Sequence, residues 1–251
     1  YNFVNNADIS ISPVDGVYKF SNVDIFEGTY LNFKYTVNTS DTDQRFIIPN
    51  DNVDTTTLSV KVQESSSDST TNTYTLATGI TGLDSTSKVY FLQEVGNGRY
   101  EVYFGDGVLG KAIADGNIII FDYINTNRAE ANGALTFTLS GTIGGFSSAT
   151  ITTISGADGG SDPEEISSIK YNAPRDYTSQ DRAVTADDYK VLVKSLYANA
   201  QSVQVYGGED AATPEYGKVF ISIKAKSGSN LTVATKNSIV QSLKQYGVAS
   251  V

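Results

Sequence analysis

The chain has 251 residues and a formal net charge of −10, with 18 Lys and Arg against 28 Asp and Glu. This acidic balance opposes attraction to nucleic acid and to anionic membrane surfaces, so we expect neither as a partner. Cysteine and histidine are both absent. Their absence excludes disulfides, zinc ribbons, thiol nucleophiles and a Ser–His–Asp triad, and it leaves carboxylate, Lys, Tyr or Ser–Lys chemistry as the catalytic options.

Methionine is also absent and the chain begins at Tyr1, which leads us to expect a fragment or a processed piece of a longer protein. No signal peptide is recognisable. The most apolar short stretch, residues 117–123, is far too short to cross a bilayer. A disulfide-free soluble protein of this kind fits assembly in a reducing cytoplasm.

The part of the chain before residue 156 has the pattern of β-structure, with short runs rich in β-branched and aromatic residues between turn residues. Leu58, Val60 and Val62 alternate with polar residues, as in a half-buried strand. Asn97-Gly98 predicts a hairpin turn. Residues 64–73 are polar throughout and predict a solvated loop or a mobile hairpin tip. We expect strands at residues 31–37, 45–48, 58–63, 89–94, 100–104, 118–123 and 135–139.

The composition changes at the Gly- and Asp-rich residues 156–163, which form the best candidate for a domain boundary. A helix follows, with Thr185 as its N-cap and an apolar stripe of Tyr189, Leu192, Val193 and Leu196. Strands are expected at residues 202–206 and 218–224, the second with Val219, Ile221 and Ile223 on one face.

A second helix is expected at residues 232–246, with Ile239, Val240, Leu243 and Tyr246 facing inward. Gly247 is expected to end this helix in a left-handed conformation, and a further strand should open at Val248. The order helix–strand–strand–helix predicts two helices that cover one face of a small antiparallel sheet.

Several motifs suggest chemistry, but each has a simpler interpretation. Gly105, Asp106 and Gly107 lack the spacing of a phosphate-binding loop and predict a structural turn between strands. Asp158 and Asp162 in a Gly-rich loop raise the possibility of calcium, without the several oxygen ligands that calcium takes. The adjacent carboxylate pairs, Glu164 with Glu165 and Glu209 with Asp210, rarely oppose each other across a cleft as glycoside hydrolysis requires.

Tyr and Arg, the residue types enriched at interface hot spots, gather in residues 171–182. The alternative is an irregular segment whose Arg side chains bond nearby carboxylates and carbonyls. A second loop-like segment adds Tyr206 and Glu209 as contact-prone residues. The candidate interface residues are therefore Arg175, Tyr177, Arg182, Tyr206 and Glu209.

Residues 89–135 closely resemble the baseplate J-like family of contractile-tail proteins. The resemblance lies in the turn Phe104-Gly105-Asp106-Gly107, in Asp115-Gly116-Asn117 and in Asn132-Gly133. A second block at residues 159–189 also resembles the family, with Ala173-Pro174-Arg175 and Asp181-Arg182-Ala183-Val184-Thr185. Residues 205–223 are most similar to the wedge-protein members from T-even-like contractile-tailed phages.

The resemblance implies a structural component of a phage tail baseplate wedge, located in the virion and assembled in the host bacterial cytoplasm. It implies an inner ring that joins wedges around the tail hub, with the chain as a homodimer within a six-fold ring of dimers. The implied partners are further copies, other baseplate wedge proteins and the sheath initiator. The family's N-terminal portion, helical in part, is expected to be missing here.

We therefore predict an α+β, multidomain fold with an unplaced β-rich segment at residues 1–43, a β-rich J-like domain at 44–158 and a small α+β domain at 159–251. We expect no enzymatic activity, cofactor or metal. One alternative is a receptor- or carbohydrate-binding β-domain of a tail fibre or spike. Another is a carboxylate glycosidase or peptidoglycan hydrolase of the baseplate.

Overall fold

The computed structural model describes residues 1–180, 182–227 and 230–247. It forms two compact units, Tyr1–Asn127 and Arg128–Val251, each with its own apolar core. The first is β-rich and the second combines helices with a small sheet, which confirms the expected α+β class. The units divide earlier than the boundary predicted at residue 158, because Asn132 and Gly133 are hydrogen-bonded to Gly160 and Ala157 of the second unit.

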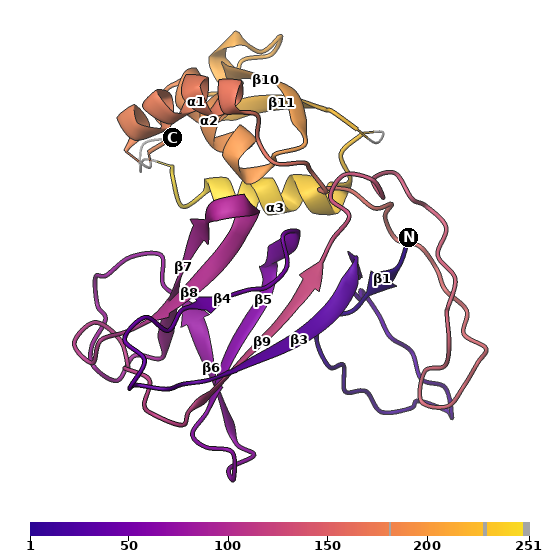
Figure 1. Ribbon diagram of the computed structural model, residues 1–251. Coiled ribbons are helices and arrows are strands. Elements are labelled where there is room, and N and C mark those ends of the chain that lie inside the picture. Colours follow the sequence, from indigo (N-terminus) through magenta and orange to yellow (C-terminus); the bar gives the residue numbers. More distant parts are fainter. Residues whose placement is uncertain (181, 228–229, 248–251) are drawn as a thin grey trace. The chain divides into compact units, whose positions relative to one another are not determined.

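A seven-stranded sheet in the order β3-β9-β5-β6-β7-β8-β4 makes up most of the first unit. Neighbouring strands are antiparallel except β6 and β7, which run parallel. Figure 1 shows β3, β9 and β5 side by side, as their pairing requires. The strands are β3 (Thr29–Thr36), β4 (Phe46–Ile47), β5 (Val53–Gln63), β6 (Thr71–Leu76), β7 (Val89–Val95), β8 (Arg99–Phe104) and β9 (Ile118–Asn125).

Strand β9 lies inside the sheet, between β3 and β5, and its sequence is apolar almost throughout. A strand that is paired on both edges and packed on its faces tolerates such a run. Ile119, Phe121 and Tyr123 of β9 join Val60 and Val62 of β5 in the buried core. The predicted alternation in β5 is therefore confirmed, with Leu58 partly buried against the same cluster. Strand β3 pairs with β9 along its whole length, so this part of the segment at residues 1–43 belongs to the sheet.

Two hairpins follow the turn signals in the sequence. Strands β7 and β8 are joined by η1 (Gly96–Gly98), where Asn97 and Gly98 both have positive φ, and this confirms the predicted Asn-Gly turn. Strands β5 and β6 form the other hairpin, and the predicted loop at residues 64–73 ends sooner because β6 begins at Thr71.

The first residues form a small separate ladder of β1 (Phe3–Val4) with β2 (Phe26–Glu27). The expected strand at residues 135–139 is wrong, because these residues form coil and Leu135 is exposed. The alternating pattern was present there, but no neighbouring strand completes a ladder.

The second unit contains the predicted order helix–strand–strand–helix and one helix more. Helix α2 (Ala186–Leu196) begins at Thr185, whose side chain accepts a hydrogen bond from the backbone of Asp188 in a capping box. Two antiparallel strands follow, β10 (Ala200–Gly207) and β11 (Val219–Ala225), with η2 (Gly208–Asp210) directly after β10. Helix α3 (Val233–Leu243) ends the described order, and helix α1 (Ile166–Ser179) precedes α2.

The core of this unit forms as the sequence predicted. Tyr189, Leu192 and Val193 of α2 are buried with Ile239 and Leu243 of α3. The apolar face of β11 packs against the same cluster, with Val219, Ile221 and Ile223 partly buried.

Two details at the end of the chain differ from the prediction. Val240, expected inward, is 52% exposed because α3 turns only the Ile239–Leu243 edge toward the core. Gly247 does not cap the helix in a left-handed conformation. The helix ends at Leu243, and Gly247 instead forms a parallel bridge with Ala183. The strand expected from Val248 lies outside the described residues.

Candidate interaction surfaces

Helix α1 replaces the loop-like segment expected around Arg175 and Tyr177. Glu165 is its N-cap residue, and the Glu164 carboxylate accepts hydrogen bonds from Ser168 Oγ at 2.5 Å and Asn172 Nδ2 at 3.0 Å. These two bonds, Ser168 first, lower the pKa of Glu164. They give the Glu164–Glu165 pair a structural role at a helix N-terminus, where negative charge is favourable.

Almost all of α1 is exposed, and Ser179 is its one buried residue. Ile166, Ile169 and Tyr177 are spaced by three and eight residues, so they lie along one side of the helix. All three are exposed, Tyr177 by 86%. The side chains therefore form an apolar stripe that no described residue of the second unit buries.

Arg175 lies on the opposite side of α1 from Tyr177. Its guanidinium carbon is 3.7 Å from the centre of the Tyr171 ring, and its Nη1 donates to the Tyr171 carbonyl at 2.6 Å. This geometry agrees with the alternative in which Arg175 bonds a nearby carbonyl. Its stacking also leaves a flat cationic surface on an exposed helix face.

Arg182 follows the end of α1, where Gln180 has a positive φ of 50°. Its Nη2 donates to Gln180 Oε1 at 2.8 Å. Thus Arg175 and Arg182 each make a local contact, and the structure does not join them in one cluster with Tyr177.

Tyr206 and Glu209 lie at the other candidate segment, where β10 passes into η2. The ring of Tyr206 stacks on Phe220 of β11 with centroids 5.4 Å apart and an angle of 17° between the planes. Gly208 is buried there, and a Cβ at this position would overlap the backbone of Glu215. The strand end is therefore a compact turn that exposes one face of Tyr206.

Residues Gly105 to Gly107 form a turn after β8. Gly107 has a φ of +88°, and its N–H donates to the Gly110 carbonyl at 3.0 Å. The Asp106 carboxylate accepts the N–H groups of Leu109 and Val108, each at 2.9 Å, and these bonds lower the Asp106 pKa. A carboxylate that fills the turn in this way occupies the place a phosphate would need.

The carboxylates suggested for chemistry do not converge. Within residues 1–180, 182–227 and 230–247, no three His, Cys, Asp or Glu side chains gather where they could hold a metal ion. Asp158 instead accepts a 2.7 Å hydrogen bond from the hydroxyl of Tyr197. None of the helices in the described part of the chain combines the length and apolar character that crossing a membrane requires.

One surface was missed by sequence reasoning. Residues 134–157 form a long loop without a charged residue, and several of its apolar side chains are exposed. The absence of charge over so long a run was the signal that could have identified it.

Comparison with known proteins gives two family matches in chain order. Residues 33–136 match the model described as bacteriophage baseplate wedge protein gp6, third domain. Residues 185–251 match the model described as baseplate structural protein gp6, C-terminal domain I. Both stretches are thus similar to gp6 baseplate wedge proteins.

A curated gp6, the baseplate wedge protein of Enterobacteria phage T4, is 33% identical over 193 residues, which cover 66% of this chain. The chain spans 28% of the length of that relative. The first gp6 match contains strands β4 to β9, and the second contains α2, β10, β11 and α3. Most of the uncharged loop and all of α1 lie between the two gp6 matches.

Proposed function

We propose that this chain is a structural part of a phage tail baseplate wedge, located in the virion, and that it acts by binding other proteins. The observation that carries the proposal is the pair of gp6 domain matches, in order, on two units that each have a buried core. The resemblance to the baseplate J-like family supports the finer assignment to an inner ring of dimers, with other wedge proteins and the sheath initiator as neighbours.

Helix α1 supplies the surface that we propose for such contacts. An isolated helix of this length is marginally stable in water, and most helices gain stability by burying an apolar face. The stripe of Ile166, Ile169 and Tyr177 is exposed in the free chain. Contact with a neighbouring protein would bury this stripe, and the stacked pair of Tyr171 and Arg175 would then lie at the rim.

The test is incorporation into baseplates of a phage that carries the variant chain. Ile169→Asp and Tyr177→Asp should each reduce incorporation by about ten-fold or more, because a charge would be buried at the contact. Ile80→Asp is the matched control, since Ile80 is an exposed apolar residue of the first unit. Normal baseplates with both α1 variants would show that α1 is not part of the interface. Baseplates that do not contain this chain would contradict the wedge role.

We also propose that the chain is not an enzyme. The support is the dispersal of its carboxylates and their engagement in turns and caps. Purified chain should not release sugars from polysaccharide or fragments from peptidoglycan. Hydrolysis that disappears in a Glu164→Gln or Glu209→Gln variant would contradict this.

A further inference from the structure

The sequence contains two Asn-Gly pairs, Asn97-Gly98 and Asn132-Gly133, and every other Asn is followed by a residue with a side chain. Asparagine is thermolabile, and it loses its side-chain amide most readily before glycine, because no Cβ hinders attack by the next backbone nitrogen. The two pairs therefore have the same local chemistry. The structure gives them very different surroundings.

Asn97 lies in the turn between β7 and β8, where it is exposed and has a φ of 66°. Its side chain makes no hydrogen bond within the described part of the chain. A Cβ at Gly98 would meet only the Asp51 carbonyl, at 3.7 Å, and one at Gly96 would meet nothing within 4 Å. None of the residues of η1 is buried, so this turn can open locally without disturbing the core.

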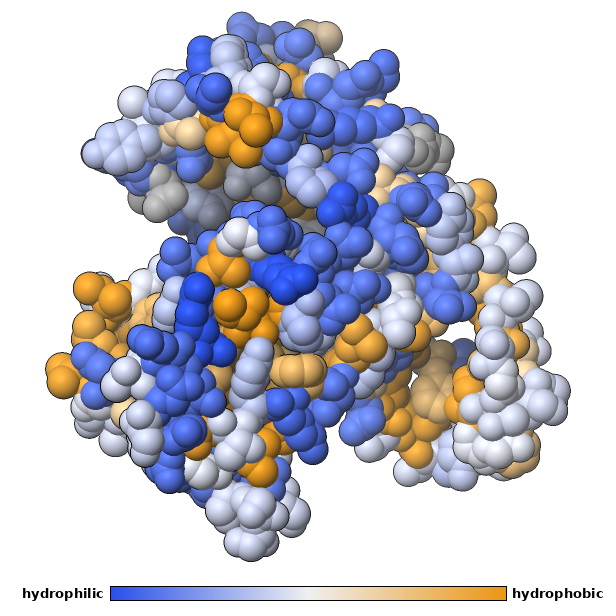
Figure 2. Space-filling model, viewed as in Figure 1, coloured by the Kyte–Doolittle hydropathy of each residue, from blue (hydrophilic) through white to orange (hydrophobic). Residues whose placement is uncertain are grey.

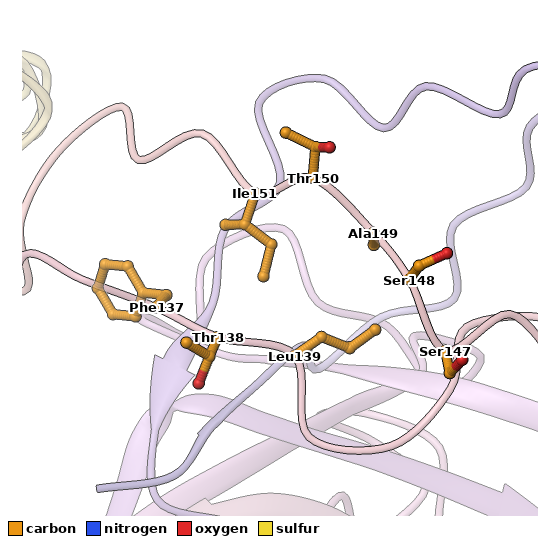
Figure 3. A pocket seen from close by; sticks show the side chains of 8 residues that line it. All are labelled: Phe137, Thr138, Leu139, Ser147, Ser148, Ala149, Thr150 and Ile151. Carbon is orange, nitrogen blue, oxygen red and sulfur yellow. The ribbon is translucent and has the colours of Figure 1, made fainter.

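Asn132-Gly133 directly precedes the uncharged loop of residues 134–157. Where Figure 1 draws this loop, Figure 2 is coloured mainly white and orange. Figure 3 shows hydroxyl and apolar side chains along two stretches of the loop, none of which can lose an amide. The loop itself is largely exposed, but the Asn-Gly pair at its base is held by hydrogen bonds.

These bonds engage both groups that would have to react. Asn132 Nδ2 donates to the Gly160 carbonyl at 2.7 Å and to Ser227 Oγ at 3.0 Å. Asn132 Oδ1 accepts the Gly160 N–H at 3.0 Å. The attacking nitrogen would be that of Gly133, and its N–H donates to the Ala157 carbonyl at 2.8 Å. These hydrogen bonds must break before the side chain and the backbone nitrogen can meet.

We propose that Asn97 is a site of spontaneous deamidation in the folded chain and that the fold protects Asn132 from the same reaction. The Gly98 nitrogen bonds to Cγ of Asn97 as the bond from Cγ to Nδ2 breaks. Nδ2 leaves as ammonia, with the proton that the Gly98 nitrogen loses. Water then opens the cyclic imide at either carbonyl and gives aspartate or isoaspartate. This chemistry does not depend on the wedge role.

Both products add a negative charge at the tip of the β7–β8 hairpin. Aspartate leaves the backbone unchanged and tolerates the positive φ of this position. Isoaspartate brings the Cβ carbon into the backbone and lengthens the turn next to the paired residues Val95 and Arg99. Turn length fixes the register of a hairpin, so the isoaspartate product should weaken this pairing.

The test follows both pairs in one sample. The purified chain is incubated in mildly alkaline buffer, and peptide mass spectrometry measures the conversion of each Asn. Asn97 should convert at least about ten-fold faster than Asn132, because only the second pair must first break its hydrogen bonds. In concentrated urea the two should convert at similar rates, because both turns are then unfolded. Equal rates in the folded chain, or a difference that persists in urea, would overturn the proposal.

A matched variant tests the route of the reaction. Gly98→Ala should slow the conversion of Asn97 by about ten-fold and leave that of Asn132 unchanged, because a Cβ then hinders the attacking nitrogen. The substitution strains a positive φ, so thermal unfolding first establishes that the variant folds. Undiminished conversion of Asn97 in the folded variant would mean that water removes the amide directly, and would overturn the proposed attack by Gly98.

Discussion

Gly105 matters to its turn because it has no Cβ, and not because of its backbone φ. A Cβ at this position would overlap the backbone of Gly110, whereas one at Gly96 would meet nothing within 4 Å. We predict that Gly105→Ala lowers the free energy of unfolding of the first unit by about 1–3 kcal/mol, as overpacking does. Gly96→Ala is the control and should change it by less than about 1 kcal/mol. Urea denaturation of the first unit measures both changes in the free energy of unfolding. Equal changes for the two variants would mean that the turn accommodates a Cβ at Gly105 without strain.

Glu101 predicts a pH dependence at the same scale. Its carboxylate is buried in an ion pair with Arg45, with Arg45 Nε donating to Oε1 at 2.8 Å, and this bond holds the Glu101 pKa below its ordinary value. The ion pair therefore stabilises the fold fully above about pH 4.5, and this contribution is lost as pH falls through the lowered pKa.

The measurement is the free energy of unfolding of wild type and Glu101→Gln from pH 7 to pH 3. The wild type should be the more stable at neutral pH, and the difference should shrink below about pH 4.5. Glu94→Gln, at an exposed position of β7, serves as the control. A difference that stays constant with pH would show that Glu101 does not ionise as described.

At the scale of elements, helix α2 depends on its buried stripe. Leu192 is 4% exposed and packs with Val193, Ile239 and Leu243. We predict that Leu192→Ala lowers the free energy of unfolding of the second unit by about 2–5 kcal/mol, through lost burial and the cavity that remains. Val240→Ala on the exposed side of α3 should change it by no more than about 0.5 kcal/mol. Thermal unfolding that shows equal shifts for both variants would contradict the core assignment.

Elements with a strong local signal were predicted well. Thr185 and Asp188 form the expected cap, and Asn97-Gly98 forms the expected turn, because both signals act within a few residues. Helix α1 was missed because Pro174 lies inside it, and a proline there removes a backbone donor and is typical of irregular segments. The expected strand at residues 135–139 has the right alternation, but a strand needs a partner that its own residues cannot specify.

At the scale of the whole molecule, the net charge controls how strongly copies of the chain associate. With a net charge of −10, copies repel at long range, and dissolved salt screens that repulsion within about 8 Å at physiological strength. We predict a monomer or weak dimer in dilute solution at low salt and stronger association as salt increases, as measured by sedimentation over a concentration series. The double variant Asp24→Asn and Glu94→Gln should associate at lower salt than wild type. Association that weakens with added salt would mean that attraction between opposite charges dominates.

The sequence by itself determined the class of the fold, the buried face of β5, most of the apolar core of the second unit and the resemblance to baseplate proteins. These follow from periodicity, turn chemistry and spaced motifs, which are all local in the chain. Only the tertiary structure decided that Arg175 and Tyr177 lie on opposite sides of a helix, that β3 and β9 pair across the first unit, and that backbone hydrogen bonds close the loop between Gly133 and Ala157. These features depend on which distant residues meet, and on whether the lengths between them match, which no local pattern records.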